Sequence, residues 1–540
     1  MMGRRRQAPA GSTVAARIDA IAAERAEAPA LVGLDEHGTE EVLSWRVLAA
    51  ETRRVTDLLR RRLPAAGAGP VVAVPAGNAP STVLGLLGAL AADLPVLPVD
   101  PRAPEWERAR LLGFVAREYG PVYLLSGADT VSLASPGTAG PRDSTGRADC
   151  AGSPDAAGFP HSAGFPDSAG FPDAEVSGPA RPGGRRLGGR TRGVGYLLAT
   201  GGSSGLTKVV AVPGPVRYDP SRTPSPLLRR AGWRAGQRQL VAGPLHHTAP
   251  FTHWLSGVLD GHTIVLLPMF AADLLVESVR RHAIEWLQLT PAHLRSVIQL
   301  AEPEPADLAS VQAMLHTAAA CDFATKKAWL ELAGPRRVFE TYGSTEEIGV
   351  TLARGDEWQA RPGTVGKGFL TQIRILDEAG RRLPAGEVGT VYMRSPRMAG
   401  RTSYLGGLPI ATSPDGFASV GDHGWLDQDG YLFLAPRRTD LINVGGENVY
   451  PAEVEAAILE HPAVLDAVVV GAPDPVLGSV VYARVVAGKA AGVARTDLIR
   501  HCAARLSPYK VPRKVSFVSA IPRSAAGKLE RWRMHGPEGR

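Results

Sequence analysis

The chain has 540 residues, far more than a single hydrophobic core holds, so at least two domains are expected. Its hydrophobic fraction of 44% is ordinary for a globular protein, and its net charge of +7 is spread along the chain, which disfavours nucleic-acid binding. No apolar run reaches the ~18 residues of a membrane helix, and none follows the basic start, so neither a membrane span nor a signal peptide is expected.

Cysteine and lysine usage adds two constraints. Cys150, Cys321 and Cys502 lie far apart and lack metal-ligand spacing, which indicates a reducing compartment and a cytoplasmic protein without a disulfide framework. Only 8 of the 60 basic residues are lysines. Composition therefore does not explain a lysine that stands inside a motif.

The first part of the chain alternates helical and strand patterns. Residues 1–13 are expected to be a disordered basic tail. Apolar residues spaced by three and four predict helices over residues 43–63 and 81–91, and short apolar runs predict strands over 71–74 and 95–98. Strand, helix and strand at this spacing form a βαβ unit, which implies a parallel sheet.

Residues 134–192 break this alternation. They are rich in Gly, Pro, Ser and Asp, and residues 157–174 contain three copies of a six-residue unit, AGFPHS, AGFPDS and AGFPDA. Such a segment buries too little apolar surface to offset its ordering entropy, so we predict a disordered insertion in a surface loop. The alternative is a partner-binding role for the repeated phenylalanines.

The globular pattern resumes after the insertion, so residues 14–437 form one large domain and residues 440–540 a smaller one. Mixed helical and strand patterns predict an α+β fold for the smaller domain. Its expected helices cover residues 451–461 and 495–506, and its expected strands cover 464–470, 480–486 and 515–518.

A loop of glycines and hydroxyls follows an apolar run that starts at Tyr196. Glycines let the backbone approach a ligand closely, hydroxyl and N–H groups donate to phosphate oxygens, and Lys208 adds positive charge. The loop is not a Walker A motif, because no lysine follows Gly205. The residues expected to bind phosphate are Thr200, Gly201, Gly202, Ser203, Ser204, Gly205 and Lys208.

The stretch that begins at Gly421 carries two groups suited to a sugar. Asp422 offers a carboxylate for a ribose diol, and Arg437 offers a bidentate fork for the same sugar or its phosphate. Farther along, Gly445 and Gly446 form a turn into a helix, whose first position suits a proline, here residue 451.

Three other runs complete the set of motifs. Glu340-Thr-Tyr-Gly-Ser-Thr-Glu346 follows a run of small residues over 315–321, and Ile521-Pro-Arg-Ser-Ala-Ala-Gly-Lys528 lies near the C-terminus. The third, Pro244-Leu-His-His-Thr-Ala-Pro-Phe251, contains His246 and His247, and His253 follows it.

These motifs, in this order and spacing, resemble those of the adenylate-forming superfamily, which includes acyl-CoA synthetases, firefly luciferases and peptide-synthetase adenylation domains. The resemblance covers nearly the whole chain except the insertion and the first dozen residues. It implies an α/β fold with a large N-terminal domain of layered sheets, which binds nucleotide and acyl group. It also implies a small, mobile α+β C-terminal lid domain that carries the catalytic lysine.

The resemblance further implies roles for single residues. The ATP-binding set gains Tyr342, Gly343, Ser344 and Thr345, with Tyr342 against the adenine and Thr345 at the α-phosphate, and Glu346 binds Mg²⁺. The catalytic residues are Lys528, at the reacting centre, and His247, at the junction of the acyl and thiol tunnels. Gly445 and Gly446 line the path of CoA or another acceptor, and Thr439 is the hinge.

The sequence departs from the usual pattern at three places. Thr207 stands where the family usually has proline, and Thr439 stands at the pivot, as in a subgroup of bacterial acyl-CoA ligases that carry Arg-x-Thr-Asp. No aspartate occurs within residues 244–251, where amino-acid-activating relatives hold an α-amino group, which argues against an amino-acid substrate.

The expected function is therefore ATP- and Mg²⁺-dependent activation of a carboxylic acid as an acyl-adenylate, followed by an acyl- or aryl-CoA thioester, in specialised metabolism such as antibiotic biosynthesis. One alternative is a diazotase that activates an unusual acid such as nitrite for an aromatic amine, since the three histidines would suit a small anion or polar aromatic. Another is a ligase that loads a carrier protein. A non-catalytic adenylate-binding regulator is a third, but it would not need Lys528.

Overall fold

The computed structural model describes residues 11–523 except for residues 36, 65–68, 135–193, 202–206, 396–401, 408, 436–441, 445–446, 475–476 and 489–492. Most of the predicted insertion, and the predicted site residues Arg437, Thr439, Gly445, Gly446 and Lys528, lie outside the described residues, so the expectations for them stay predictions.

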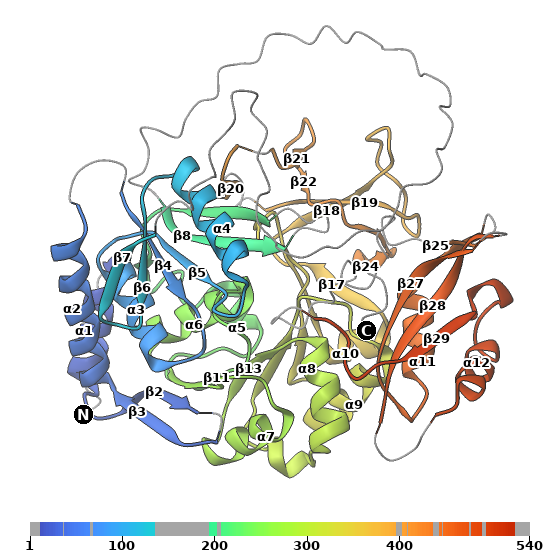
Figure 1. Ribbon diagram of the computed structural model, residues 1–540, viewed down its shortest axis with the longest axis horizontal. Coiled ribbons are helices and arrows are strands. Elements are labelled where there is room, and N and C mark those ends of the chain that lie inside the picture. Colours follow the sequence, from blue (N-terminus) through green and yellow to red (C-terminus); the bar gives the residue numbers. More distant parts are fainter. Residues whose placement is uncertain are drawn as a thin grey trace, which may run out of the picture.

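Two large sheets form the layers of the N-terminal part of the molecule (Figure 1). The larger one has 15 strands in the order β21 (Ala411–Thr412), β22 (Ala418–Ser419), β19 (Gly389–Arg394), β23 (His423–Leu426), β24 (Tyr431–Ala435), β17 (Thr364–Gly368), β16 (Thr351–Arg354), β15 (Val338–Glu340), β14 (Ala313–His316), β13 (Trp286–Leu289), β11 (Arg238–Val241), β12 (Thr263–Leu266), β2 (Pro29–Leu34) and β3 (Glu40–Ser44), with β18 (Gln372–Leu376) paired to β19. The second has seven, namely β20 (Ser403–Tyr404), β9 (Thr207–Pro213), β8 (Val194–Gly201), β5 (Val96–Val99), β4 (Val71–Pro75), β6 (Val122–Ser126) and β7 (Thr130–Leu133).

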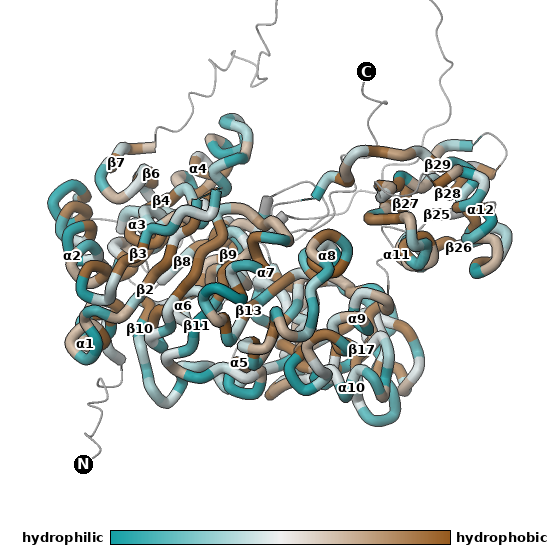
Figure 2. The backbone as a smooth tube through the Cα atoms, turned by 90° about the horizontal axis from the view of Figure 1, so that it is seen from below, coloured by the Kyte–Doolittle hydropathy of each residue, from teal (hydrophilic) through white to brown (hydrophobic). Residues whose placement is uncertain are grey.

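Helices cover these sheets, and apolar strands lie inside while the outer helix faces are polar (Figure 2). The helices of this part are α1 (Val14–Glu24), α2 (Trp45–Arg62), α3 (Pro80–Ala91), α4 (Glu105–Glu118), α5 (Pro226–Arg230), α6 (Thr248–Leu259), α7 (Ala272–Arg281), α8 (Pro291–Ser296), α9 (Phe323–Ala333) and α10 (Gly355–Ala360). Among the residues that the structure describes, no helix is both long and apolar enough to pass through a membrane.

The βαβ unit predicted near the start is confirmed. Strands β4 and β5 pair in parallel around α3, which is buried except at Ser81 and therefore carries no polar stripe. Helix α2 begins one residue after Ser44, whose hydroxyl accepts a hydrogen bond from the N–H of Val47, the expected N-cap arrangement.

The prediction of a disordered tail over residues 1–13 is wrong for Ser12 and Thr13. Ser12 and Thr13 form β1 (Ser12–Thr13), which pairs with β10 (Arg217–Tyr218), and α1 follows at once, capped by the Thr13 hydroxyl. Partners more than 200 positions away hold this segment, so local composition gave no sign of it.

The C-terminal part forms a separate small unit with a core of its own. Its elements are β25 (Ile442–Val444), β26 (Glu447–Val449), α11 (Pro451–Leu459), β27 (Val464–Asp474), β28 (Gly478–Ala487), α12 (Arg495–Ala503) and β29 (Lys514–Phe517). All five predicted helices and strands occur, and Pro451 opens α11 as expected. The described members of the main core of this unit all come from residues 442–515.

Candidate active site

Two antiparallel strands flank the predicted phosphate loop. Strands β8 and β9 are antiparallel, with Thr200 opposite Lys208, and the Thr200 hydroxyl donates to the Lys208 carbonyl over 3.4 Å. Residues 202–206 lie outside the described residues, so Gly202, Ser203, Ser204 and Gly205 remain predicted phosphate ligands. Lys208 lies near the start of β9, beside the edge strand β20 of the seven-stranded sheet.

Tyr404 connects this lysine to the predicted metal ligand. It lies on β20, opposite Val210 of β9, with the Lys208 ammonium 4.9 Å from the centre of its ring. The Tyr404 hydroxyl donates to Oε1 of Glu346. Burial, together with this carboxylate, raises the pKa of Tyr404, so the hydroxyl keeps its proton as a donor. Tyr404 was missed in the sequence, because a lone tyrosine in a Gly-rich stretch carries no spacing signal.

The residues predicted for adenine and ribose also meet. The hydroxyl of Tyr342 donates to Oδ2 of Asp422 over 2.7 Å, although the two are 80 positions apart. Tyr342 follows β15, and Asp422 directly precedes β23. Tyr342 packs against the apolar cluster that includes Val365 and Leu432, and its hydroxyl contacts the carboxylate.

Thr345 meets the N-terminus of α6. Its hydroxyl lies 2.8 Å from the hydroxyl of Thr248, the first residue of that helix, and His247 is the N-cap. A helix N-terminus favours negative charge, so this contact suits a phosphate oxygen. The Ser344 hydroxyl is buried without a hydrogen-bond partner among the described residues, which leaves a donor for a ligand oxygen.

The other two histidines are held neutral by their surroundings. Burial lowers the pKa of His246 even though Asp100 lies 3.6 Å from its Nε2, and burial lowers the pKa of His253 to about 4. The His253 ring stands edge-on to Trp286, with centroids 5.3 Å apart. At neutral pH these two imidazoles can donate or accept hydrogen bonds, but they supply no positive charge to attract a small anion.

A buried charge cluster lies at the base of the loops. The ammonium of Lys326, on α9, donates to Glu340 Oε2 over 3.0 Å and to Nε2 of His316. Glu340 is the last residue of β15, and His316 is the last residue of β14. All three are buried, and burial raises the pKa of Glu340 more than Lys326 lowers it. The cluster therefore joins α9 to the strands that lead into residues 317–321 and 341–346.

The candidate metal site contains one carboxylate. Among the residues that the structure describes, no group of three or more His, Cys, Asp or Glu side chains could hold a metal ion. Magnesium often takes only one or two carboxylates and completes its shell with phosphate oxygens and water, so Glu346 fits that ion beside a nucleotide. The described residues do not form a metal site made of protein ligands alone.

The layered α/β fold and this clustered set of hydroxyls and carboxylates fit a nucleotide-binding protein. Residues 18–401 match the family model described as AMP-binding enzyme, and residues 453–528 match that of the AMP-binding enzyme C-terminal domain. The chain belongs to the AMP-binding enzyme family.

Curated relatives are similar over part of their length. A sulfoacetate–CoA ligase of Cupriavidus necator is 31% identical over 300 residues, 55% of this chain and 58% of the relative. A 2-succinylbenzoate–CoA ligase of Bacillus cereus is 31% identical over 304 residues, 56% of this chain and 62% of the relative. The chain thus matches less than two thirds of each relative.

Solved structures are similar in fold over nearly the whole chain. The o-succinylbenzoate CoA synthetase of Bacillus subtilis, in complex with the acyl-adenylate intermediate OSB-AMP, has a TM-score of 0.69 at 23% identity and covers 97% of this chain and 98% of its own. An amide bond synthetase from Marinactinospora thermotolerans has a TM-score of 0.67 at 24% identity, over 96% of this chain and 99% of its own. At these identities the likeness establishes the fold.

Proposed function

We propose that the protein is an AMP-forming ligase that activates a carboxylic acid with ATP and Mg²⁺ and then transfers the acyl group to CoA. The observation that carries this proposal is the 2.7 Å hydrogen bond between Tyr342 and Asp422. It brings the residues proposed for adenine and ribose together from segments 80 positions apart. The CoA ligases among the relatives support the same activity.

The chemistry needs a better leaving group on the acid. A carboxylate oxygen attacks the α-phosphorus of ATP, the bond to pyrophosphate breaks, and the acid becomes a mixed anhydride with AMP. Thr345 and the N-terminus of α6 stabilise the negative charge that develops at the α-phosphate. Asp422 and Arg437 would hold the ribose, and Glu346 would hold Mg²⁺, which would offset the phosphate charge.

Transfer follows when a thiol attacks the acyl carbon and AMP leaves. We propose CoA as the thiol, with Gly445 and Gly446 on its path and Thr439 as the pivot of the small domain. A carrier protein or an amine could accept the same acyl group, and only the acceptor distinguishes these enzymes. The scattered cysteines support a cytoplasmic setting.

A pyrophosphate-release assay with ATP and Mg²⁺ across fatty, aryl, steroid-like and nitrite substrates tests the proposal. Each acid is paired with CoA and, separately, with an aromatic amine or a carrier protein. We expect turnover to need an organic acid and CoA. Turnover that needs nitrite and an amine would replace CoA ligation with nitrogen–nitrogen bond formation, and no pyrophosphate with any acid would refute the adenylation itself.

Substitution of the proposed catalytic lysine tests the mechanism. In Lys528→Ala, adenylation should fall by roughly 10²–10³-fold, because an ammonium aimed at developing charge is lost, while ATP binding is unchanged. Lys514→Ala, an exposed lysine on β29, is the matched control. Pyrophosphate release by Lys528→Ala at the wild-type rate would remove this lysine from the mechanism.

A further inference from the structure

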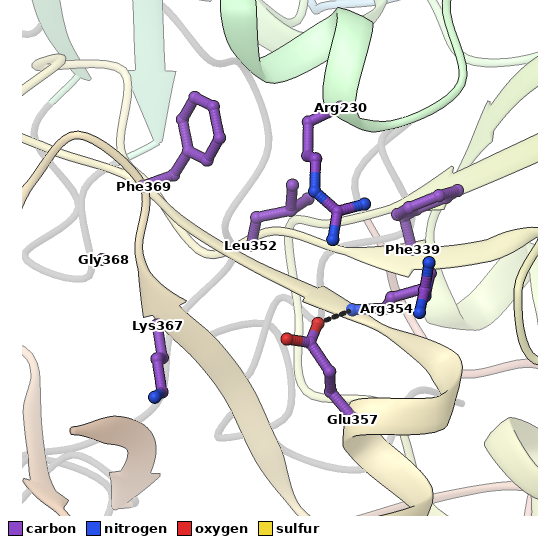
Figure 3. A pocket seen from close by; sticks show the side chains of 8 residues that line it. All are labelled: Arg230, Phe339, Leu352, Arg354, Glu357, Lys367, Gly368 and Phe369. Carbon is purple, nitrogen blue, oxygen red and sulfur yellow. Dashed lines mark hydrogen bonds between the residues drawn. The ribbon is translucent and has the colours of Figure 1, made fainter. Parts of the chain in front are cut away.

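A cavity of about 160 Å³ between α5 and the strands β15, β16 and β17 lies outside the nucleotide site (Figure 3). Its lining residue Lys367 pairs with Tyr431, whereas the preceding residue Gly366 pairs with Leu432, whose cluster packs against Tyr342. Successive residues of a strand face opposite sides, so the cavity and Tyr342 lie on opposite faces of the sheet. The contacts that shape the nucleotide site are therefore found between its own segments.

Two sheet edges meet at that site. Strands β4, β5 and β8 of the seven-stranded sheet run parallel side by side, so β4 ends at the same edge as β8, where the residues predicted to bind phosphate begin with Thr200. In the 15-stranded sheet, residues 242–247 connect the end of β11 to α6, whose first residue Thr248 meets Thr345. The distance between Thr200 and α6 therefore depends on how the two edges are joined.

One buried side chain, Asn78, joins these edges. It follows β4 and is only 5% exposed. Its Nδ2 donates to the carbonyl of Gly243 over 3.0 Å, and its Oδ1 accepts from the N–H of Leu245 over 3.2 Å. Gly243 and Leu245 are themselves buried in the segment between β11 and α6. The amide thus supplies the hydrogen bonds that a neighbouring strand would give these backbone groups in a sheet.

The next residue of this segment is held from the same edge. Nδ1 of His246 lies 3.4 Å from the carbonyl of Ala76, after β4, and its Nε2 lies 3.6 Å from Oδ2 of Asp100, after β5. The His246 ring lies against that of His247, the N-cap of α6, with centroids 4.3 Å apart. Polar contacts from the seven-stranded sheet therefore reach the first turn of α6.

An apolar contact also links the two sheets. The rings of Tyr196, on β8, and Phe251, on α6, have centroids 5.1 Å apart. Contacts between rings tolerate small shifts, whereas hydrogen bonds weaken steeply when their angle is lost. Loss of the Asn78 amide should therefore leave the sheets packed together while the start of α6 moves.

We propose that Asn78 is a positioning residue for adenylation, which holds residues 243–245 so that the N-terminus of α6 faces the α-phosphate of bound ATP. This inference rests on the proposed adenylation. A misplacement of about 1 Å can cost about 100-fold in rate, whereas other segments hold the adenine and the ribose. Asn78 thus acts on the rate of the chemical step and not on the affinity for the nucleotide.

The substitution Asn78→Asp tests this inference, because it keeps the size of the side chain and the acceptor for Leu245. The new carboxyl group can donate to the Gly243 carbonyl only while it is protonated. In ATP–pyrophosphate exchange, with the acid that gives the highest wild-type rate, we expect kcat at about pH 8 to fall roughly 10–100-fold, with the KM for ATP unchanged. Relative to the wild type, this deficit should shrink toward about pH 6, because protonation restores the donor.

Gln237→Glu is the matched control. Gln237 is also a buried amide, 3% exposed, but it precedes β11 at the opposite end of the strand. It donates to the Gly232 carbonyl over 3.3 Å and accepts from the N–H of Arg234 over 2.7 Å. We expect a comparable loss of stability in urea with the wild-type kcat at each pH. Equal losses of kcat in both variants, or a loss confined to the KM for ATP in Asn78→Asp, would overturn the inference.

Gly243→Ala disturbs the same contact without a change at Asn78. A Cβ at this position would lie 2.7 Å from Cγ of Pro250, on α6, so the segment or the helix must shift. We expect the same pattern, a lower kcat at an unchanged KM for ATP, and this variant decides the question if Asn78→Asp does not fold. A wild-type kcat in Gly243→Ala would overturn the inference.

The wild-type rate separates this inference from the proposed function. If the wild type shows no exchange with any acid, the proposed adenylation fails and this inference fails with it. If the wild type exchanges pyrophosphate and Asn78→Asp does so with the same kcat at every pH, adenylation stands and only the role of Asn78 is refuted.

Discussion

The nucleotide side of the large domain and the attachment of the small domain are joined in different ways. In the large domain, segments far apart in the chain meet through single hydrogen bonds, such as the Tyr342–Asp422 bond of 2.7 Å, above buried sheets. The small domain has a core of its own and meets the large one through polar contacts, such as Arg295 Nη1 with Asp466 Oδ1 at 3.2 Å. The segments of the large domain thus belong to one fold, whereas the small domain has its own core and contacts the large domain through polar groups.

A short series of ion pairs connects the small domain to the large one. Arg295, on α8, also pairs with Asp322 at 2.8 Å, while Arg523 of the small domain holds Asp466 through its Nε at 2.9 Å and its Nη2 at 2.7 Å. Arg523 precedes the proposed catalytic Lys528 by five positions. These contacts between the domains are charged, and the small domain keeps an apolar core of its own.

The largest expected effect concerns the buried charge cluster of Lys326 and Glu340 in the large domain. Lys326→Met leaves Glu340 buried without its cation, which should lower the free energy of unfolding by about 3–5 kcal/mol, measured by urea denaturation. Lys327→Met, at an exposed neighbouring lysine of α9, should change it little. Lys326→Met combined with Glu340→Leu should recover most of the loss. A single variant as stable as the wild type would mean that the cluster does not brace the loops.

A smaller effect is expected at Tyr404, which contacts the proposed metal ligand Glu346. Tyr404→Phe removes the hydroxyl that donates to Glu346, a hydrogen bond to a charged group worth about 1.5–3 kcal/mol. We expect weaker binding of the Mg²⁺–ATP complex, measured by calorimetry at several Mg²⁺ concentrations, and a free energy of unfolding that falls by no more than this amount. Tyr509→Phe, an exposed tyrosine of the small domain, is the control. An unaltered Mg²⁺ dependence would mean that the Tyr404 hydroxyl does not influence metal binding and that the side chain contributes only to packing.

The comparison also explains what the sequence could and could not predict. The small domain's elements follow from local periodicity, so α11 and β27 were found within a few residues of their ends. The family motifs placed Tyr342 and Asp422 in one site, and the structure joins them. Such predictions rest on neighbours in the chain.

Residues whose partners are distant could not be predicted in this way. Tyr404 lies on a strand of two residues, so it has no periodic pattern around it. Its position depends on sheet register, which no single segment encodes. Lys326 did leave a signal, because lysine is rare in this chain and this one stands on an apolar helix after a motif.

The smallest effect on the free energy of unfolding is expected at the contact between the two domains, where Asp466 pairs with Arg295 and Arg523. Asp466→Asn removes the charge shared by Arg295 and Arg523, yet Arg295 keeps Asp322, so the free energy of unfolding should fall by only about 1 kcal/mol. If the contact between the domains selects one domain arrangement, its loss shifts the population toward the other. Adenylation, measured by pyrophosphate exchange, and acyl transfer, measured in a single turnover, should then change in opposite directions. Asp497→Asn, which removes a surface pair with Arg500 on α12, should alter neither. Equal losses in both half-reactions would show that Asp466 supports the small domain's structure without selecting its position.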